Sequence, residues 1–165
     1  MVVTIKKILL TLLLPIFILG GTMADELTTS DRLDIIDVMS SYARGIDTKD
    51  FDFYATIFSD DVEVNILYTP NYGTDNTVSI KGADNWVNYV DREISKFRNT
   101  QHMLGNPMIS YNGEVAIVRT DLRAIHYYAD RPDVSTTFWG YYETYMVNQG
   151  EWKVIKHTLT GIGVN

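Results

Sequence analysis

The sequence predicts an α+β fold in which helices cover one side of an antiparallel sheet. Two stretches of the chain, 30–58 and 83–97, repeat apolar residues at the spacing of an amphipathic helix. From residue 101 to residue 160 apolar residues recur at every second position instead, which is typical of strands. The segments between these strands are short and turn-like, and they favour hairpins over the long crossovers that parallel strands need.

The first expected helix begins at Ser30 and ends at Gly45. Ser30 is a favourable N-cap, and Gly45 ends the apolar periodicity as a C-cap glycine does. A second, shorter helix is expected from about Thr48 to Phe58. The apolar stripes that these helices would bury are Leu33, Ile36, Met39 and Ala43 in the first and Phe51, Tyr54, Ala55 and Phe58 in the second.

Six strands and a third helix are expected after residue 61. The third helix, Ala83 to Phe97, places Trp86, Val90 and Ile94 on one face, and the loop 69–77 is rich in turn residues. Asn112-Gly113 is the strongest hairpin signal, and a second hairpin turn is expected at 148–150. The expected strands are one around Val62, Val64 and Ile66, then Val78–Lys81, Gln101–Tyr111, Glu114–Tyr128, Ser135–Val147 and Trp152–Thr160.

The first 24 residues have the features of a secretory signal peptide. Lys6 and Lys7 precede a short apolar run, and small residues at Thr22 and Ala24 mark a cleavage site. The run is shorter than the roughly 20 apolar residues that span a bilayer, so no stable membrane anchor is expected after cleavage. The sequence therefore predicts a secreted or periplasmic protein cleaved near Ala24, with residues 25–165 forming one domain.

Composition excludes several classes of function. The 165 residues include no cysteine, which excludes thiol nucleophiles and disulfide frameworks. A formal net charge of -7 argues against nucleic-acid partners, because their binding depends on Lys and Arg at the phosphates. No phosphate-binding glycine loop, nucleophile elbow or His-x-x-x-His metal pair is present, and Asp60-Asp61 is interpreted as a solvated turn. The three histidines are then the candidates for proton transfer near neutral pH.

Alternation along the strands places two histidines on the apolar side of the sheet. His126 shares its parity with Val118 and Leu122, and His102 shares its parity with Leu104. They could converge in a pocket or each be a hydrogen-bonded core histidine, and spacing alone favours the core. His157, near the C-terminus, is expected to be exposed or to serve in packing.

The remaining candidates have equally ordinary interpretations. Asp47, read from its position alone, is the N-cap of the second helix, with Asp50 completing a capping pair. Tyr42 falls at the boundary between the apolar and polar sides of its helix. The aromatic run 138–145 is suited to core and interface packing, or to lining an apolar cavity.

Four motifs follow one another along the chain: Tyr42-Ala43-Arg44-Gly45-Ile46-Asp47-Thr48-Lys49-Asp50-Phe51-Asp52, Phe58-Ser59-Asp60-Asp61, Thr100-Gln101-His102-Met103-Leu104-Gly105-Asn106 and Trp152-Lys153-Val154. Taken in this order, they resemble the SnoaL-like branch of the nuclear transport factor 2 superfamily. The likeness runs from about Ser30 to Leu159, and the order and spacing of the motifs are more specific than any one of them. It is strongest toward the scytalone dehydratases and more distant toward hexachlorocyclohexane dehydrochlorinases.

The resemblance implies a cone-shaped, curved sheet around an apolar cavity that contains an Asp–His pair. Asp47 and His102 match that pair, and His126 matches the second pocket histidine of the dehydratases. Ile46 and the region of Ile66 stand where the dehydratases have tyrosines, and their pocket asparagine falls at Tyr141, so their substrate does not transfer. The pocket residues implied are Tyr42, Ile46, Ile66, Tyr68, Trp86, Leu104 and Tyr141.

The expected function is that of an exported small-molecule lyase or isomerase acting on an apolar, oxygenated compound. His102 would be the general base, Asp47 would orient it, and His126 with Tyr141 or Tyr68 would polarise the substrate oxygen. No metal or organic cofactor is expected. One alternative is a non-catalytic protein that binds a small hydrophobic ligand in the same cavity. Another is an assembly subunit, since sheets of this fold commonly pair into homodimers.

Overall fold

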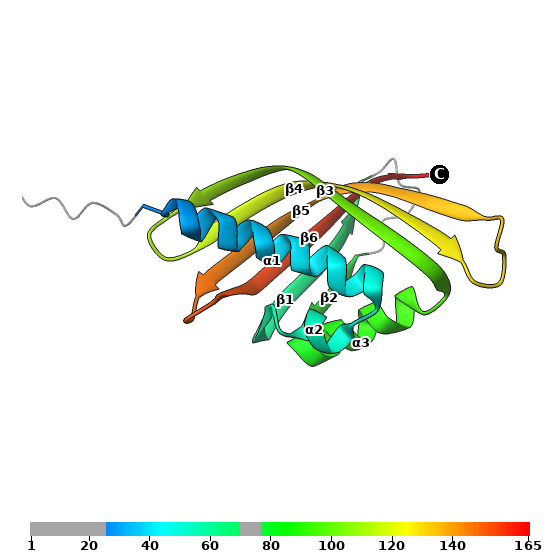
Figure 1. The fold of residues 1–165 in the computed structure, drawn as a ribbon, viewed down its shortest axis with the longest axis horizontal. Coiled ribbons are helices and arrows are strands. Elements are labelled where there is room, and N and C mark those ends of the chain that lie inside the picture. Colours follow the sequence, from blue (N-terminus) through cyan, green and yellow to red (C-terminus); the bar gives the residue numbers. More distant parts are fainter. Residues whose placement is uncertain (1–25, 70–76) are drawn as a thin grey trace, which may run out of the picture.

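The computed structural model describes residues 26–69 and 77–165 and consists of three helices against one face of a curved sheet (Figure 1). The predicted signal peptide, and most of the expected loop 69–77, lie outside these residues. In the part that is described, no helix combines the length and the apolar character needed to cross a membrane. The helices are α1 (Thr29–Thr48), α2 (Phe51–Ala55) and α3 (Ala83–Ile94). The strands are β1 (Phe58–Tyr68), β2 (Val78–Lys81), β3 (Phe97–Tyr111), β4 (Ala116–Tyr128), β5 (Ser135–Asn148) and β6 (Trp152–Val164).

The six strands form one open, mixed sheet in the order β2-β1-β6-β5-β4-β3. Strands β3 to β6 pair through successive antiparallel hairpins, as the turn signals predict. The exception is β1, which runs parallel to β6 and antiparallel to β2. The predicted α+β class with a curved, mixed sheet is therefore confirmed.

The ends of the first two helices differ from the expected positions. The N-cap of α1 is Thr28 rather than Ser30, because Thr28 and Asp31 form a reciprocal capping box. Gly45 does not end α1, which continues to Thr48 and turns at Lys49 with a φ of 57°. A side chain at Gly45 would meet Tyr54 of α2, so this glycine serves close helix packing instead of capping.

The second and third helices are shorter than predicted, whereas α1 extends beyond its predicted end. Asp50, not Asp47, caps α2, since the Phe53 backbone amide donates a hydrogen bond of 3.0 Å to Asp50 Oδ1. Because Asp47 still belongs to α1, its carboxylate is free to point elsewhere. Phe97 begins β3 instead of ending α3, and its buried ring satisfies the apolar pattern in either conformation.

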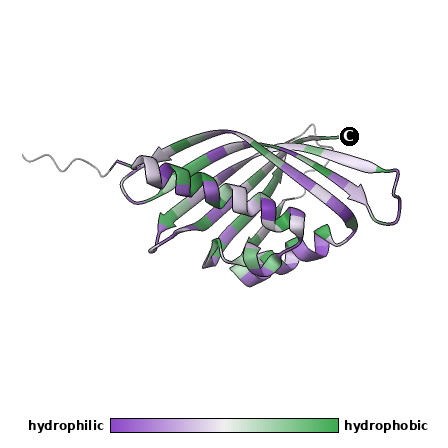
Figure 2. Ribbon diagram, viewed as in Figure 1, coloured by the Kyte–Doolittle hydropathy of each residue, from purple (hydrophilic) through white to green (hydrophobic). Residues whose placement is uncertain are grey.

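The core fills the space between the helices and the inner face of the sheet. Figure 2 shows hydrophobic and hydrophilic residues alternating along the long strands, so one face is apolar. Tyr42, expected at a boundary, is buried at 2% exposure against Tyr54 and Tyr142, with both ring centroids 5.1 Å away. His157 is fully buried, and its ring stacks on that of Tyr42 with 4.7 Å between the centroids. Of the two expected roles, exposure and packing, His157 therefore has the packing role.

One glycine of the sheet is predicted to be required for stability. A β-carbon at Gly140 would overlap with the carbonyl oxygen of Thr160 on the neighbouring strand β6, whereas one at Gly163 would meet nothing within 4 Å. Gly140→Ala is expected to lower the free energy of unfolding by about 1–3 kcal/mol. Gly163→Ala should change it by less than about 0.5 kcal/mol. Urea denaturation of both variants tests this, and equal losses would contradict the close approach of β5 and β6.

Candidate functional site

A cavity of roughly 260 Å³ opens between α1, α3 and the inner face of the sheet. Its lining is mainly apolar and aromatic, which suits a small hydrophobic molecule. The polar groups that face it include the two imidazoles of His102 and His126, on the neighbouring strands β3 and β4. The apolar part of the lining includes Ile46, Ile66, Trp86, Leu122, Phe138 and Tyr142.

Asp47 and His102 form a close pair at the inner wall of this cavity. Asp47 Oδ1 lies 2.7 Å from His102 Nδ1, and Oδ2 accepts the His102 backbone amide at 2.8 Å. Thr100 donates its hydroxyl to Oδ1 at 2.8 Å. One carboxylate therefore fixes both the backbone and the ring of His102, and it leaves Nε2 as the ring nitrogen available to a bound molecule.

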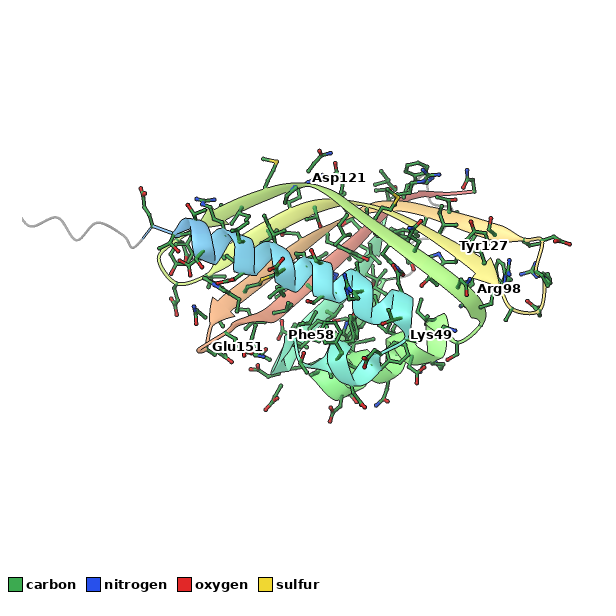
Figure 3. The ribbon with its side chains drawn as sticks, viewed as in Figure 1. Lys49, Phe58, Arg98, Asp121, Tyr127 and Glu151 are labelled. Atoms are coloured by element: carbon green, nitrogen blue, oxygen red, sulfur yellow. The ribbon has the colours of Figure 1, made fainter. Side chains whose placement is uncertain are left out.

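The pair is held where the last turn of α1 crosses β3. The helix reaches β3 because it continues past Gly45, and Lys49 lies at its end (Figure 3). A second link comes from the Lys49 ammonium, which donates to the Phe97 carbonyl at 2.7 Å. The side chain of His102 is 6% exposed and that of Asp47 is 22% exposed. A separate outer hollow, lined by Arg44, Asp47 and Leu104 among others, lies on the other side of the pair.

The electrostatics of Asp47 favour its ionised form. Partial burial alone would raise the pKa of this carboxyl, but the hydrogen bonds and charge of His102, with the Thr100 hydroxyl, outweigh it. The pKa of Asp47 is therefore lowered. An ionised carboxylate at Nδ1 sets the tautomer of His102, with the proton on Nδ1 and the lone pair on Nε2.

His126 lies next to His102 and has the opposite electrostatic character. The two ring centroids are 5.4 Å apart in an edge-to-face arrangement, and Phe97 covers the other side of His126 at 4.7 Å. Burial, followed by the neighbouring His102, lowers the pKa of His126 to about 4. His126 is therefore neutral at pH 7 and can donate an N–H bond to an oxygen atom in the cavity.

The structure brings most of the expected pocket residues together, but not all of them. Leu104 lines the outer hollow beneath α1 and does not line the main cavity. Tyr141 points to the opposite face of the sheet, where the Arg119 guanidinium lies 3.9 Å from its ring centroid. Side chains alternate along β5, so its neighbour Tyr142 faces the cavity instead. The expected residues that line the cavity are Tyr42, Ile46, Ile66, Tyr68 and Trp86, together with His102 and His126.

Sequence reasoning identified some further residues of the lining only as a group and missed others. Phe138 and Tyr142 belong to the aromatic run 138–145, for which lining a cavity is one of two predicted roles, and the inward parity of β5 distinguishes them from their neighbours. Glu93 and Lys96 also line the cavity, but no sequence signal marks them, because their position depends on how α3 turns into β3. In the described ranges, no three or more His, Asp and Glu side chains gather as metal ligands would.

Comparison with known proteins shows that the fold of this chain is a known one. Residues 27–158 match the family model of the SnoaL-like domain, whereas comparison with curated proteins gives no match. The structure is similar to that of a candidate scytalone dehydratase from Novosphingobium aromaticivorans, with a TM-score of 0.70, 25% identity, and coverage of 82% of this chain and 87% of that one.

Two further solved structures show the same fold at lower identity. A hexachlorocyclohexane dehydrochlorinase from Novosphingobium barchaimii aligns with a TM-score of 0.66 and 18% identity, over 80% of this chain and 86% of that one. A Nostoc punctiforme protein of unknown function with a cystatin-like fold aligns with a TM-score of 0.66 and 18% identity, over 83% and 95% of the two chains.

Proposed function

The chain belongs to the SnoaL-like domain family of the nuclear transport factor 2 superfamily, and we propose that it is a lyase or isomerase acting on a small, apolar, oxygenated compound. The observation that carries this proposal is the 2.7 Å contact between Asp47 Oδ1 and His102 Nδ1 at the wall of an apolar cavity. That geometry leaves one basic nitrogen directed to a bound molecule and supports it with a carboxylate.

In the proposed reaction His102 Nε2 removes a proton from carbon next to a carbonyl or leaving group. The electron pair of the broken C–H bond moves toward the carbonyl oxygen, or forms a double bond as the leaving group departs. Asp47 stabilises the imidazolium, and neutral His126 donates a hydrogen bond to the oxygen that gains charge. In an isomerisation the proton returns from His102 to another carbon, and in an elimination it is released to solvent.

The relatives support elimination chemistry as one form of this reaction. The similar structures include proteins named for the loss of water and of hydrogen chloride. The chain differs from the dehydratase pattern, because Ile46, Ile66 and the outward-facing Tyr141 stand where the resemblance implies polar pocket groups. The substrate is therefore proposed only as a class.

Proton exchange into a bicyclic ketone tests the proposal without knowledge of the natural substrate. 2-Tetralone has acidic C–H bonds beside a carbonyl on an apolar ring system, and its uptake of deuterium from D₂O can be followed by proton NMR. The proposal expects wild-type protein to accelerate exchange with saturation as the ketone concentration rises. Saturable binding with no acceleration would reject catalysis for this ketone class and favour the alternative of a non-catalytic binding protein.

We also propose that two copies of the chain pair through the outer face of the sheet. The helices cover the other face (Figure 1). The outer face exposes Met103 at 54% and Trp139 at 41%. Arg123 lies 4.9 Å from the Trp139 ring centroid, which adds a hydrogen-bonding rim to the apolar surface. Sedimentation at micromolar concentration should show a dimer that Trp139→Glu converts to monomer. A monomeric wild-type protein would reject this interface.

A further inference from the structure

The entrance of the cavity carries two charged side chains from the end of α3 and the turn that follows it. Among the described residues that line the cavity, Glu93 is the acidic side chain and Lys96 is the basic one besides the two histidines, His102 and His126. Lys96 Nζ lies 2.8 Å from Glu93 Oε2. The Lys96 side chain is 53% exposed and the Glu93 side chain is 41% exposed. Because both also line the cavity, a molecule bound there can reach them.

Lys96 is held in a defined position relative to the site. Its backbone carbonyl accepts the Ala129 amide at 3.1 Å, which ties the α3–β3 turn to the end of β4. Its ammonium lies 5.6 Å from the ring centroid of Phe97, the same ring that covers His126. The ammonium therefore lies between Glu93 and the Phe97 ring, at one wall of the cavity.

The charge of Lys96 acts on two residues of the cavity lining that lie on different strands, Tyr68 on β1 and His126 on β4. Burial and the charge of Glu93 raise the pKa of Tyr68, and the charge of Lys96 opposes that rise. Lys96 also adds, after burial and His102, to the effects that lower the pKa of His126. These effects require the ammonium to lie near both side chains.

Charged side chains of opposite sign therefore lie at opposite ends of the cavity. Asp47, which is ionised, lies behind His102 at the inner wall, and Lys96 lies at the entrance. A molecule with an anionic group at one end would be repelled from Asp47, and at the entrance it could compete with Glu93 for the Lys96 ammonium, so it would bind in one orientation.

We propose that Lys96 is an anion subsite that makes the cavity selective for apolar ring compounds carrying a carboxylate at the end nearest the entrance. The ammonium has three N–H donors, so it can bind a carboxylate while keeping its contact with Glu93. This inference rests on the proposed function, since it orients the uncharged end of the same substrate class toward His102. It makes Lys96 a residue that determines specificity and leaves proton transfer to the histidines.

Affinities of a matched pair of ligands test the subsite directly. 2-Naphthoate and its neutral counterpart 2-naphthamide have nearly the same shape, so their ratio of affinities, measured by calorimetry, isolates the charge. Wild-type protein is expected to bind the naphthoate about tenfold more tightly than the amide, as one charge-assisted contact allows. Lys96→Gln should bring the ratio close to one without weakening the amide.

Two further variants separate the subsite from general electrostatics. Glu93→Gln should increase the preference for naphthoate, because it removes the carboxylate that competes for Lys96. Lys81→Gln is the matched control, since Lys81 pairs with Glu63 at 3.4 Å on the β1–β2 ribbon and does not line the cavity. That control should leave the ratio unchanged.

Several outcomes would overturn the inference: equal affinities in wild type, a preference that persists in Lys96→Gln, or no binding of either compound. The proposed function is judged separately, by exchange into 2-tetralone. Naphthoate selectivity without exchange would reject catalysis for that ketone class and keep the subsite. Exchange without selectivity would keep the catalytic role and reject the subsite.

Discussion

His102→Gln is expected to slow deuterium exchange into bound 2-tetralone by about 10²–10⁴-fold. The substitution removes the basic Nε2 and leaves a side chain of similar polarity, so Asp47 keeps its hydrogen bonds to Thr100 and to the backbone amide of residue 102. The ketone should still bind with nearly unchanged affinity, because the aromatic lining is untouched. The rate is measured by NMR at saturating ketone.

His126→Gln is the matched comparison for that result. It also removes a cavity imidazole, but glutamine can still donate a hydrogen bond to the substrate oxygen. The loss of rate is therefore expected to be about tenfold or less, well below that of His102→Gln. If the two variants lost equal activity, or if His102→Gln kept the wild-type rate, His102 would not be the base.

Acid is expected to destabilise the protein through His157, and this loss of stability begins near pH 6.5, above the range in which carboxylates titrate. Burial lowers the pKa of His157 from 6.5 to about 3, and its Nδ1 lies 2.9 Å from the Thr144 hydroxyl. Below pH 6.5 the unfolded chain binds a proton that the folded protein does not, so the stability falls as the pH falls from 6.5 toward 3. For His157 the loss at pH 5 is about 2 kcal/mol.

Urea denaturation at pH 7.5 and pH 5 measures this loss. His157→Gln is expected to be less stable at pH 7.5, because it loses the ring stacked on Tyr42, but to lose about 2 kcal/mol less than wild type on acidification. His126, with a pKa of about 4, adds a second loss of the same sign in both proteins. As a direct check on wild type, the NMR signals of the His157 ring should not titrate between pH 7.5 and 5. A normal titration would contradict the burial.

Much of the fold could be predicted from periodicity, and the errors have local causes. The strands Val78–Lys81 and β3 to β6 lie where alternation and hairpin turns indicate. Gly45 was interpreted as a C-cap because sequence alone does not show that Tyr54 packs against it. The parallel pairing of β1 with β6 leaves no turn signal, since about half of the chain lies between the two strands.

The site was less predictable, because it depends on contacts between distant segments. Asp47 and His102 are 55 residues apart, and the position of Asp47 alone predicts it to be the cap of α2. Only the family resemblance pairs the two residues, and the structure then places them 2.7 Å apart. The same resemblance placed Tyr141 in the pocket, while the parity of β5 directs Tyr142 there. Strand parity was the more reliable guide on this strand.

The parallel contact between β1 and β6 also sets the order in which the molecule can assemble. The hydroxyl of Ser59 in β1 donates to the carbonyl of Val154 in β6, 95 residues later, and β6 is a central strand of the sheet. During synthesis β1 therefore emerges with one edge open long before its partner exists. Such non-local closure is slow and leaves apolar strand edges available to other chains. A chain that is truncated before β6 is therefore expected to aggregate, which light scattering of the truncated protein would measure.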